Sequence, residues 1–431
     1  MFSWTQNPQW GLVLLADRVA QRAIPRLPGS AGFHFAGDGG WYRTTPFIMR
    51  DTTFYVDPSS RDDPPKFSIL AKALECLNNY HIFAGATVTV ELSDGTYRID
   101  DVIKFEHPQA QQVRITGVSP RQRIGFAEIK KDGDDLILKV ESIKGLSVGM
   151  SIITQGEGQF WNYHPGGHTI KHIKASYVRV SRSLLNQGPW WAEYKGLSAY
   201  LYYYKTKIDC PNSGLFLPNG IGRLSRMSMH GHWVPSLITV DEPVFKHHGV
   251  FTYDRAFFSD LIVSNFLRGI TVRYHHFDLN FVAVYNCRDG IMVDCDSCVT
   301  MSGNLYCNES IGQGIYLHQA QAQIGSSQYY SHSAIVYLKG NGMGLLSSGV
   351  SHSWTNNVLI QFNAVGMITY QRGSVIFGNG LQPNHINANT SVDILAMDGG
   401  FIRGNYRGGS AGNCNPPNRI VGNNQAYIVV D

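Results

Sequence analysis

A repeated glycine followed by a short apolar strand constrains the fold of this 431-residue chain more than any other feature. Five such segments lie between residues 260 and 375, and their glycines are 21, 24, 30 and 22 residues apart. Repeats of this length with a strand and a turn but no helix predict a parallel solenoid, because one coil cannot bury its apolar side chains while a stack can. The segments are Gly269-Ile270-Thr271-Val272, Gly290-Ile291-Met292-Val293, Gly314-Ile315-Tyr316-Leu317, Gly344-Leu345-Leu346-Ser347 and Gly366-Met367-Ile368-Thr369.

The alternation of side chains along a strand predicts which residues of each repeat face inward. The residue after each glycine is Ile, Leu or Met, so we expect it to point into the solenoid and the second and fourth residues to point outward. Asn265 and Asn286 each precede their glycine by four residues. Because Asn is a common turn residue, we expect these two amides to stack as a structural ladder rather than to bind a ligand.

The composition agrees with a large buried core and excludes several other classes of protein. Hydrophobic residues make up 43% of the chain and charged residues only 16%, which excludes global disorder. The net charge of +4, without a Lys/Arg block, argues against a nucleic-acid partner. No apolar run reaches the roughly 18 residues that a membrane span needs. The seven cysteines are scattered and odd in number, so we expect reduced thiols and synthesis in a cytoplasm.

Four segments with different patterns follow one another along the chain. The first carries a short amphipathic helix, Pro8 to Ile24, whose apolar face suggests a protein partner. The second has an apolar stripe of helical spacing over residues 67–80, with prolines near its start. The expected divisions are a docking module at 1–50, an entrance helix and the first coils at 51–131, a small β insertion at 132–206, and the main solenoid with the C-terminal segment at 207–431.

Outward positions of successive coils are predicted to converge on one polar patch. Residues two apart on one strand share a face at about 6.5–7 Å, and equivalent residues on adjacent coils lie about 4.8 Å apart. The fourth residue past each glycine therefore forms an outward column, and the sixth residue of two coils lies beside it. The column is Arg273, Asp294, His318, Ser348 and Tyr370, and the neighbours are His275 and Asp296.

The carboxylates of this patch suggest glycan chemistry. Glycoside cleavage needs two carboxyl groups, about 5–5.5 Å or 6.5–9.5 Å apart, and Asp294 and Asp296 are expected on one face of a strand. Repulsion between close carboxylates would raise the pKa of one of them and make it a general acid. We therefore expect Asp294, Asp296 and His318 to be catalytic. Outward polar residues on a solenoid also commonly form only a solvated face, so a structural interpretation stays open.

Cations and aromatic side chains are the expected substrate-binding groups. Arg273 is placed to orient an acidic sugar, and flat aromatic faces suit the C–H surfaces of sugars. Trp190 and Trp191 belong to the densest aromatic run of the sequence, which fits a sugar site, the core of the insertion or a contact between subunits equally well. The expected substrate-binding residues are Arg273, His275, Tyr316, Tyr370, Trp190 and Trp191.

We expect no metal and no cofactor. Cys295 and Cys298 have the CxxC spacing of a zinc ligand pair, but a second CxxC is missing from the sequence. Adjacent histidines such as His247 and His248 point to opposite faces of a strand and cannot bind one ion together.

The chain resembles bacteriophage tailspikes and related receptor-binding tail proteins of the right-handed, single-stranded parallel β-helix, pectate-lyase-like type. The resemblance covers roughly residues 51–410. It rests on the helix at 67–80 that leads into Val88-Thr89-Val90 and Asp94-Gly95-Thr96-Tyr97, on Leu146-Ser147-Val148-Gly149-Met150 in the insertion, and on the coils at 269–369. It implies a homotrimer, fixed to the virion by its N-terminal part, whose solenoid binds and often cleaves host cell-surface polysaccharide.

Three functions follow as expectations. The first is a tailspike in the virion tail that binds and depolymerises host polysaccharide, as a glycoside hydrolase or a lyase, and contacts baseplate or tail proteins through residues 1–50. The second is a non-catalytic receptor-binding or structural tail protein of the same architecture. The third, a secreted pectin-type lyase, predicts a secretion signal and a calcium cluster, and the sequence contains neither pattern. The absence of a pectate-lyase calcium cluster supports glycan binding more strongly than catalysis.

Overall fold

The structure is a computed structural model of the chain. The expected docking helix Pro8 to Ile24 and the pair Trp190 and Trp191 lie outside the residues that it describes. It describes residues 33–35, 41–43, 46–133, 135–156, 166–181, 194–233, 247–301, 303–325, 336–355, 358–361, 363–377, 385–387, 389, 391–404 and 427–429.

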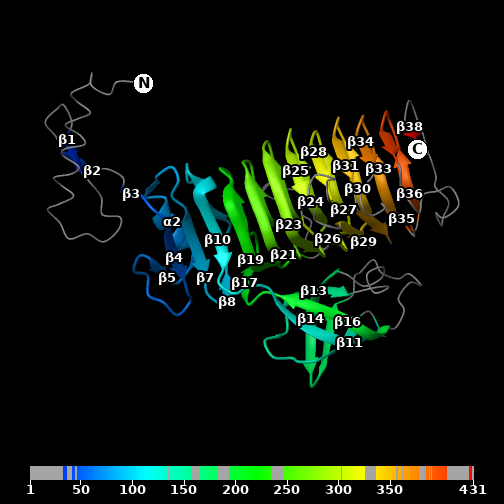
Figure 1. Cartoon of the computed structure of the whole chain (residues 1–431), viewed down its shortest axis with the longest axis horizontal. Helices are drawn as coiled ribbons and strands as arrows, with labels where there is room; N and C mark the ends of the chain where they lie inside the picture. The colour runs from blue at the N-terminus through cyan, green and yellow to red at the C-terminus, as the bar shows by residue number, and fades with distance from the viewer. Residues whose placement is uncertain are drawn as a thin grey trace.

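Parallel strands of successive coils stack into an elongated solenoid (Figure 1). The nine-stranded sheet shows the repeat most directly, because each coil contributes one strand to it. This arrangement confirms the predicted all-β fold, a parallel β-helix. The strands of the nine-stranded sheet are β9 (Ile103–Lys104), β18 (Leu215–Leu217), β20 (His248–Thr252), β22 (Arg268–Arg273), β24 (Asp289–Asp294), β27 (Gln313–His318), β30 (Met343–Ser348), β33 (Val365–Thr369) and β36 (Val392–Ala396).

The other faces of the solenoid form one continuous sheet of 19 strands, called the large sheet below. Long strands of the earlier coils serve two of its faces, since β23 pairs with both β25 and β26 of the next coil. Its strands are β4 (Thr52–Val56), β5 (Lys66–Phe67), β7 (Val88–Leu92), β8 (Gly95–Arg98), β10 (Val113–Gly117), β17 (Thr206–Cys210), β19 (Ile221–Gly231), β21 (Ala256–Ser264), β23 (His276–Tyr285), β25 (Cys298–Met301), β26 (Leu305–Asn308), β28 (Gln321–Ile324), β29 (Val336–Lys339), β31 (His352–Thr355), β32 (Val358–Gln361), β34 (Ser374–Phe377), β35 (His385–Asn387), β37 (Phe401–Gly404) and β38 (Tyr427–Val429).

The repeated glycines stack in a column where neighbouring coils approach most closely. A Cβ atom added at Gly290 would lie 2.5 Å from the carbonyl oxygen of Gly314 and 2.3 Å from Sγ of Cys307. Likewise, a Cβ atom added at Gly314 would lie 2.7 Å from the carbonyl oxygen of Gly344 in the next coil. The repeat that the sequence displays is therefore imposed by backbone contact between coils, which leaves no room for a side chain.

The residue after each glycine is buried in the core, as the alternation predicts. None of these five side chains exposes more than 1% of its surface: Ile270, Ile291, Ile315, Leu345 and Met367. The amide of Asn286 donates a hydrogen bond to Oδ1 of Asn265, which confirms the expected stacking of the two turn residues. Burial of one apolar column over many coils is what stabilises a solenoid.

A second ladder of asparagines, which the sequence analysis missed, lies inside the solenoid. Oδ1 of Asn363 accepts a hydrogen bond from the backbone N–H of Asn341 at 2.8 Å, and Oδ1 of Asn389 accepts from the N–H of Asn363 at 3.0 Å. All three side chains are buried. The ladder satisfies backbone donors at turns where the strand pairing is interrupted.

A single helix closes the N-terminal end of the described solenoid. Helix α2 (Leu70–Leu77) lies within the range predicted for it and buries Leu70, Ala73, Leu74 and Leu77. Ile69 precedes the first turn and remains 40% exposed. The helix is followed by β6 (His81–Ile82), which pairs with β3 (Phe47–Ile48). The remaining short elements are η1 (Ala110–Gln112) and the antiparallel pair β1 (Phe33–Phe35) and β2 (Trp41–Arg43).

The insertion is a closed antiparallel barrel of six strands. It opens with β11, which begins at Gln122 and pairs with both β12 and β16. The barrel therefore includes residues 122–131, which the sequence analysis assigned to the first coils, because β11 runs without a turn until Gly133. Its strands are β11 (Gln122–Asp132), β12 (Asp135–Val140), β13 (Ser151–Gly156), β14 (Gly166–Lys174), β15 (Tyr177–Ser181) and β16 (Tyr194–Tyr203).

The barrel packs on one face of the large sheet (Figure 1). The hydroxyl of Tyr285 donates a hydrogen bond of 2.7 Å to the carbonyl oxygen of His168 in the barrel. Oγ of Ser151 lies 3.0 Å from Oγ of Ser264. Around these contacts lies an apolar cluster that includes Ile153, Tyr204, Ile262, Ala283, Tyr285, Tyr306, Tyr337 and Leu359.

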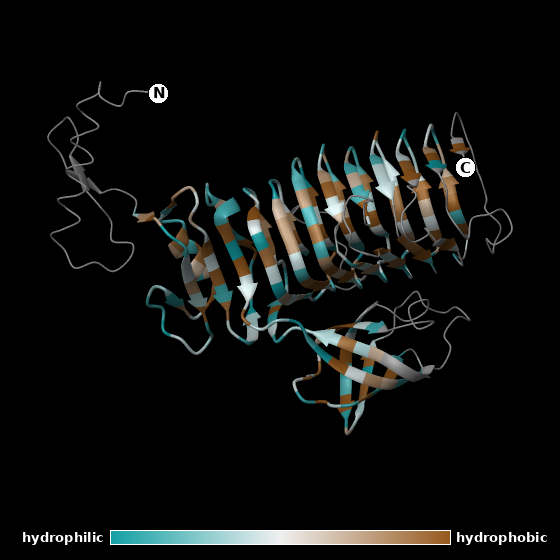
Figure 2. Ribbon diagram, in the orientation of Figure 1, coloured by the Kyte–Doolittle hydropathy of each residue, from teal (hydrophilic) through white to brown (hydrophobic). Residues whose placement is uncertain are grey.

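Hydropathy alternates along the strands of both units, as Figure 2 shows by colour. Brown and teal residues follow one another along many of the strands. In β7, for example, Val88, Val90 and Leu92 are buried and the two residues between them are partly exposed. In the part of the chain that the structure describes, no helix has the length and hydropathy needed to cross a bilayer.

Candidate functional site

The predicted column of outward residues is in register at the end of the nine-stranded sheet. Arg273 of β22 pairs with Asp294 of β24, Asp294 pairs with His318 of β27, and His318 pairs with Ser348 of β30. Tyr370 follows the end of β33 and donates its backbone N–H to the carbonyl oxygen of Ser347 at 2.9 Å. The regular stacking of coils therefore brings together side chains that lie more than twenty residues apart in the sequence.

Asp294 forms the centre of the column, and both of its carboxylate oxygens are used. Oδ1 lies 2.8 Å from Nδ1 of His318, and Oδ2 lies 3.1 Å from Nη2 of Arg273. Only 5% of the residue is exposed. Burial alone would raise the pKa of this carboxyl, but the hydrogen bonds from His318 and Cys295 and the charge of Arg273 outweigh it and lower the pKa below its usual value.

The hydrogen bond to Asp294 fixes which nitrogen of the His318 ring is the donor. An ionised carboxylate only accepts hydrogen bonds, so Nδ1 of His318 carries the proton of the shared bond. Nε2 is then left to exchange a proton with a third group. A carboxylate that fixes the tautomer and orientation of a histidine is a recurrent way of building a general base.

Asp296 does not pair with Asp294 along one strand, contrary to the prediction. Strand β24 ends at Asp294, and Cys295 and Asp296 both adopt left-handed backbone conformations with φ of 54° and 60°. The alternation of faces stops where the strand stops, so the second carboxylate turns away into solvent while the first stays buried. The lowered pKa of Asp294 favours its ionised form, so of the two carboxyl groups Asp294 is the less suited to act as a general acid.

Asp296 instead lines a polar cleft at the turn that follows the column. The cleft has a volume of about 360 Å³. Gly349 connects it to the column, because a Cβ atom added there would lie 3.0 Å from Nε2 of His318. The cleft is lined by Asp296, Gln319, Ala320, Gln321, Gly349, Val350 and His352.

Left-handed residues shape the turns of this cleft in successive coils. Gln319 and Val350 have φ of 49° and 66°, and neither is a glycine. The backbone N–H of Asp296 donates to the carbonyl oxygen of Gln319 at 2.6 Å, so the turns are hydrogen-bonded from coil to coil. Strained, rigidly stacked turns beside a polar cleft are typical of binding sites, since the scaffold maintains a conformation that an isolated loop would leave.

The predicted binding residues differ in how close they come to the column. The Tyr316 ring lies 6.0 Å from the His318 ring, centroid to centroid, and its hydroxyl accepts a hydrogen bond from Oγ of Ser348 at 3.3 Å. His275 lies in an exposed turn, with Nε2 3.8 Å from Oδ1 of Asp254. Tyr370 accepts a hydrogen bond from the Gln371 amide.

Arg273 packs against an aromatic group of the preceding coils. Its guanidinium carbon lies 5.5 Å from the centroid of the Phe251 ring, and Phe251 stacks at 5.4 Å on Phe216. The ring of Tyr253 lies 5.9 Å from that of Tyr274, which is exposed. The contact with Phe251 helps to hold the Arg273 guanidinium in place, because a cation is attracted to the face of an aromatic ring.

The sequence analysis missed most of the residues that line the cleft. Gln321 and His352 lie seven and eight residues past their glycines, and the turns before them differ in length from coil to coil. In the coil that begins at Gly314, Gln321 already belongs to strand β28 of the large sheet. Counting a fixed number of residues from each glycine cannot locate side chains that follow a turn whose length differs from coil to coil.

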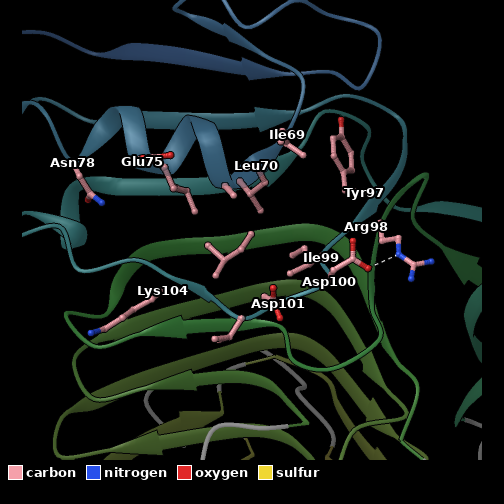
Figure 3. A pocket seen from close by; sticks show the side chains of 14 residues that line it. Ile69, Leu70, Glu75, Asn78, Tyr97, Arg98, Ile99, Asp100, Asp101 and Lys104 are labelled. Carbon is pink, nitrogen blue, oxygen red and sulfur yellow. Dashed lines mark hydrogen bonds and ion pairs between the residues drawn. The ribbon is translucent and has the colours of Figure 1, made fainter.

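A second cleft, of about 490 Å³, lies at the N-terminal end of the solenoid (Figure 3). Helix α2 forms one wall, with Leu70 and Glu75, and the segment from Tyr97 to Lys104 forms the other. Nε of Arg98 and Oδ1 of Asp100 make an ion pair of 2.6 Å at its rim. This cleft shares no residue with the column or the polar cleft.

Metal-ligating residues do not gather in the described ranges. Among them, no group of three or more His, Cys, Asp or Glu side chains is arranged to hold an ion. Cys295 and Cys298 have free thiols on either side of the turn that follows β24.

Comparisons with known proteins give structural matches of low identity and low TM-score. No family model and no curated protein matches the chain. Among solved structures, the complex of XylC with xylose has a TM-score of 0.30 at 10% identity and covers 82% of this chain and 77% of its own. The gp54 tailspike of Acinetobacter baumannii bacteriophage AP22, in complex with A. baumannii capsular saccharide, has a TM-score of 0.19 at 9% identity and covers 80% and 76%. The Pseudomonas phage phi297 tailspike gp61 has a TM-score of 0.20 at 11% identity and covers 77% and 68%.

Proposed function

We propose that this protein is a bacteriophage tailspike that binds host cell-surface polysaccharide on its solenoid and cleaves it at His318. The observation that carries the proposal is the hydrogen bond of 2.8 Å between Asp294 and His318 beside the polar cleft. The parallel β-helix and the resemblance of residues 51–410 to tail proteins support the virion location, the homotrimer and the attachment through residues 1–50. These three features are part of the proposal.

In this mechanism Asp294 is a positioning residue and His318 is the catalytic base. The buried carboxylate keeps Nδ1 of the imidazole protonated, so that Nε2 is free to take a proton from the substrate or from water. Arg273 keeps Asp294 ionised and adds positive charge beside the site. A base held in one tautomer typically contributes a factor of about 10² to 10⁴ to the rate.

Asp296 is the second acid-base group of the proposal. Its carboxyl group is exposed at the cleft wall, and the proposal assigns to it the transfer of a proton to the oxygen of the leaving sugar as the glycosidic bond breaks. In a hydrolysis, Nε2 of His318 takes a proton from the water that attacks the anomeric carbon. In an elimination, Nε2 takes the C5 proton of a uronate, the electron pair forms the C4=C5 double bond, and the C4–O bond breaks.

Purified full-length protein incubated with a panel of bacterial capsular and O-antigen polysaccharides tests the proposal. We expect new reducing ends with at least one polysaccharide, and ultraviolet absorbance of an unsaturated uronate only if the reaction is an elimination. His318→Ala should lower the rate of cleavage by about 10² to 10⁴ and Asp294→Asn should lower it less, whereas His172→Ala on the barrel surface should leave it unchanged. Binding without cleavage by the wild-type protein would overturn the catalytic part of the proposal.

The alternative is a non-catalytic receptor-binding tail protein, and one observation favours it. Asp294 is buried and both its oxygens have partners, which is also how a purely structural ion pair is built. This alternative predicts that Asp294→Asn with Asp296→Asn leaves adsorption to the host surface unchanged. Adsorption of labelled protein to host cells, measured beside the reducing-end assay, separates the two functions.

A further inference from the structure

Among the residues that the structure describes, Trp354 is the most exposed large aromatic residue on the coils that carry the proposed site. It lies on β31 with 58% of its surface exposed. Its neighbours on the same strand, Ser353 and Thr355, are buried, so the indole lies on the outer face of the large sheet. An apolar ring of this size is left in water only at a cost in solvation, unless it has a partner.

The surroundings of Trp354 are polar on the side of β28 and suit a hydroxylated ligand there, while Ile376 of β34 lies on its other side. Gln323 of β28 lies directly beside it in the parallel register, and Gln321 pairs in the same way with His352. The imidazole of His352 is anchored through Nδ1, 2.6 Å from Oγ of Ser374. Glutamine amides present both donors and acceptors, which match sugar hydroxyls, and an indole face matches the C–H side of a sugar ring.

This face continues directly into the polar cleft beside His318. Gln321 and His352 line the cleft, and Gln323 and Trp354 lie two residues further along the same strands. Residues two apart on a strand lie about 6.5–7 Å from each other on one face. A short oligosaccharide that leaves the cleft along β28 and β31 therefore meets the indole next.

We propose that Trp354 is the stacking platform of an extended polysaccharide subsite that runs from the cleft around the corner of the solenoid onto the large sheet. The proposal rests on the proposed function and deepens it, because it assigns a direction and a minimum length to the bound chain. Gln321, Gln323 and His352 supply the polar contacts between the cleft and the indole.

Oligosaccharides of increasing length provide the test. A disaccharide, a tetrasaccharide and a hexasaccharide are prepared from the polysaccharide of the panel that the wild-type protein retains, and their affinities are measured by calorimetry. We expect Trp354→Ala to weaken binding of the hexasaccharide about tenfold and to leave the disaccharide unaffected, since only the longer chain reaches the indole. Trp354→Phe should restore most of the loss because it keeps an aromatic face.

Controls separate this subsite from the rest of the proposal. Tyr177→Ala, which removes an exposed aromatic ring from the barrel, should bind every oligosaccharide as the wild type does. If cleavage occurs, Trp354→Ala should raise KM for the long chain and leave kcat unchanged, whereas His318→Ala lowers kcat. Equal affinity of Trp354→Ala and wild type for the hexasaccharide would overturn the subsite while the proposed function stands. Failure of the wild-type protein to retain any polysaccharide would overturn both.

Discussion

The solenoid and the barrel are both made of strands, but they use their outer faces differently. In the solenoid, parallel register repeats one position of the sequence in every coil, so Arg273, Asp294 and His318 come into contact although they belong to three coils. In the barrel, antiparallel strands close on themselves, and one side is covered by the solenoid through contacts such as that of Tyr285 with His168. Stacked parallel coils therefore align equivalent side chains of successive coils in a column on the outer face. A closed antiparallel barrel has no such repeat and forms a compact unit instead.

The largest expected effect is on the rate of polysaccharide cleavage, and it tests whether the catalytic residues lie on the solenoid and not on the barrel. His318→Ala should lower the rate of polysaccharide cleavage by about 10² to 10⁴, because it removes the group that exchanges the proton. His172→Ala, the matched exposed histidine of the barrel, should leave the rate unchanged. Reducing-end assays on both variants check this, and an equal loss in the two would contradict the assignment of roles to the two units.

Acid is expected to weaken the barrel through His168. Burial lowers the pKa of His168 to about 4, and its neutral ring donates through Nδ1 to the carbonyl oxygen of Ser181 and accepts from the hydroxyl of Thr154. Because the pKa in the folded state lies below the unfolded value of about 6.5, the stabilisation is complete above pH 6.5 and is lost as the pH falls towards 4. The loss amounts to about 3 kcal/mol at most.

Hydrogen exchange of β14 between pH 7 and 4 measures this effect. His168→Gln, which does not titrate, should flatten the pH dependence of protection in β14. A wild-type slope that persists in His168→Gln would assign the acid sensitivity to other groups.

The next largest expected effect is a loss of stability when a glycine of the solenoid column is replaced. Gly290→Ala should lower the free energy of unfolding by about 2–3 kcal/mol, because the added Cβ collides with the backbone of the next coil, which cannot move aside. Gly133→Ala in the barrel meets no neighbouring atom and should cost only about 1 kcal/mol, from its left-handed backbone. Urea unfolding of both variants checks the difference, and a smaller loss for Gly290→Ala would show that the coils can separate slightly.

The smallest expected effect concerns the contact between the two units. Tyr285→Phe removes the hydroxyl that donates to the carbonyl oxygen of His168, and should cost about 1 kcal/mol. We expect faster hydrogen exchange in β14 and unchanged exchange in the nine-stranded sheet. Faster exchange in both would mean that the barrel and the solenoid unfold as one cooperative unit.

Much of the solenoid could be predicted from the sequence, because its physical cause repeats. Each glycine marks a close approach of two coils, and each following apolar residue marks the core, so the register of Arg273, Asp294 and His318 follows by counting. The same counting fails after the strand ends. Asp296 lies beyond that point, and its left-handed backbone turns it away from Asp294 into the cleft.

The start of the barrel and the internal ladder of Asn341, Asn363 and Asn389 escaped prediction for a related reason. The barrel closes through antiparallel pairs such as β11 with β16, whose residues are some seventy positions apart and carry no repeat. The asparagines lie at turns of unequal length, so their common position is visible only once the coils are stacked.

The sequence by itself determined that the chain is a stack of parallel coils and which side chains form its core and its outward column, because periodic spacing translates directly into position in a solenoid. Only the tertiary structure decided that Asp294 is buried between His318 and Arg273, that Asp296 lines the polar cleft beside them, and that Trp354 lies next to that cleft on the outer face of the large sheet. Turn conformation and burial depend on contacts between coils, and no single repeat contains those contacts.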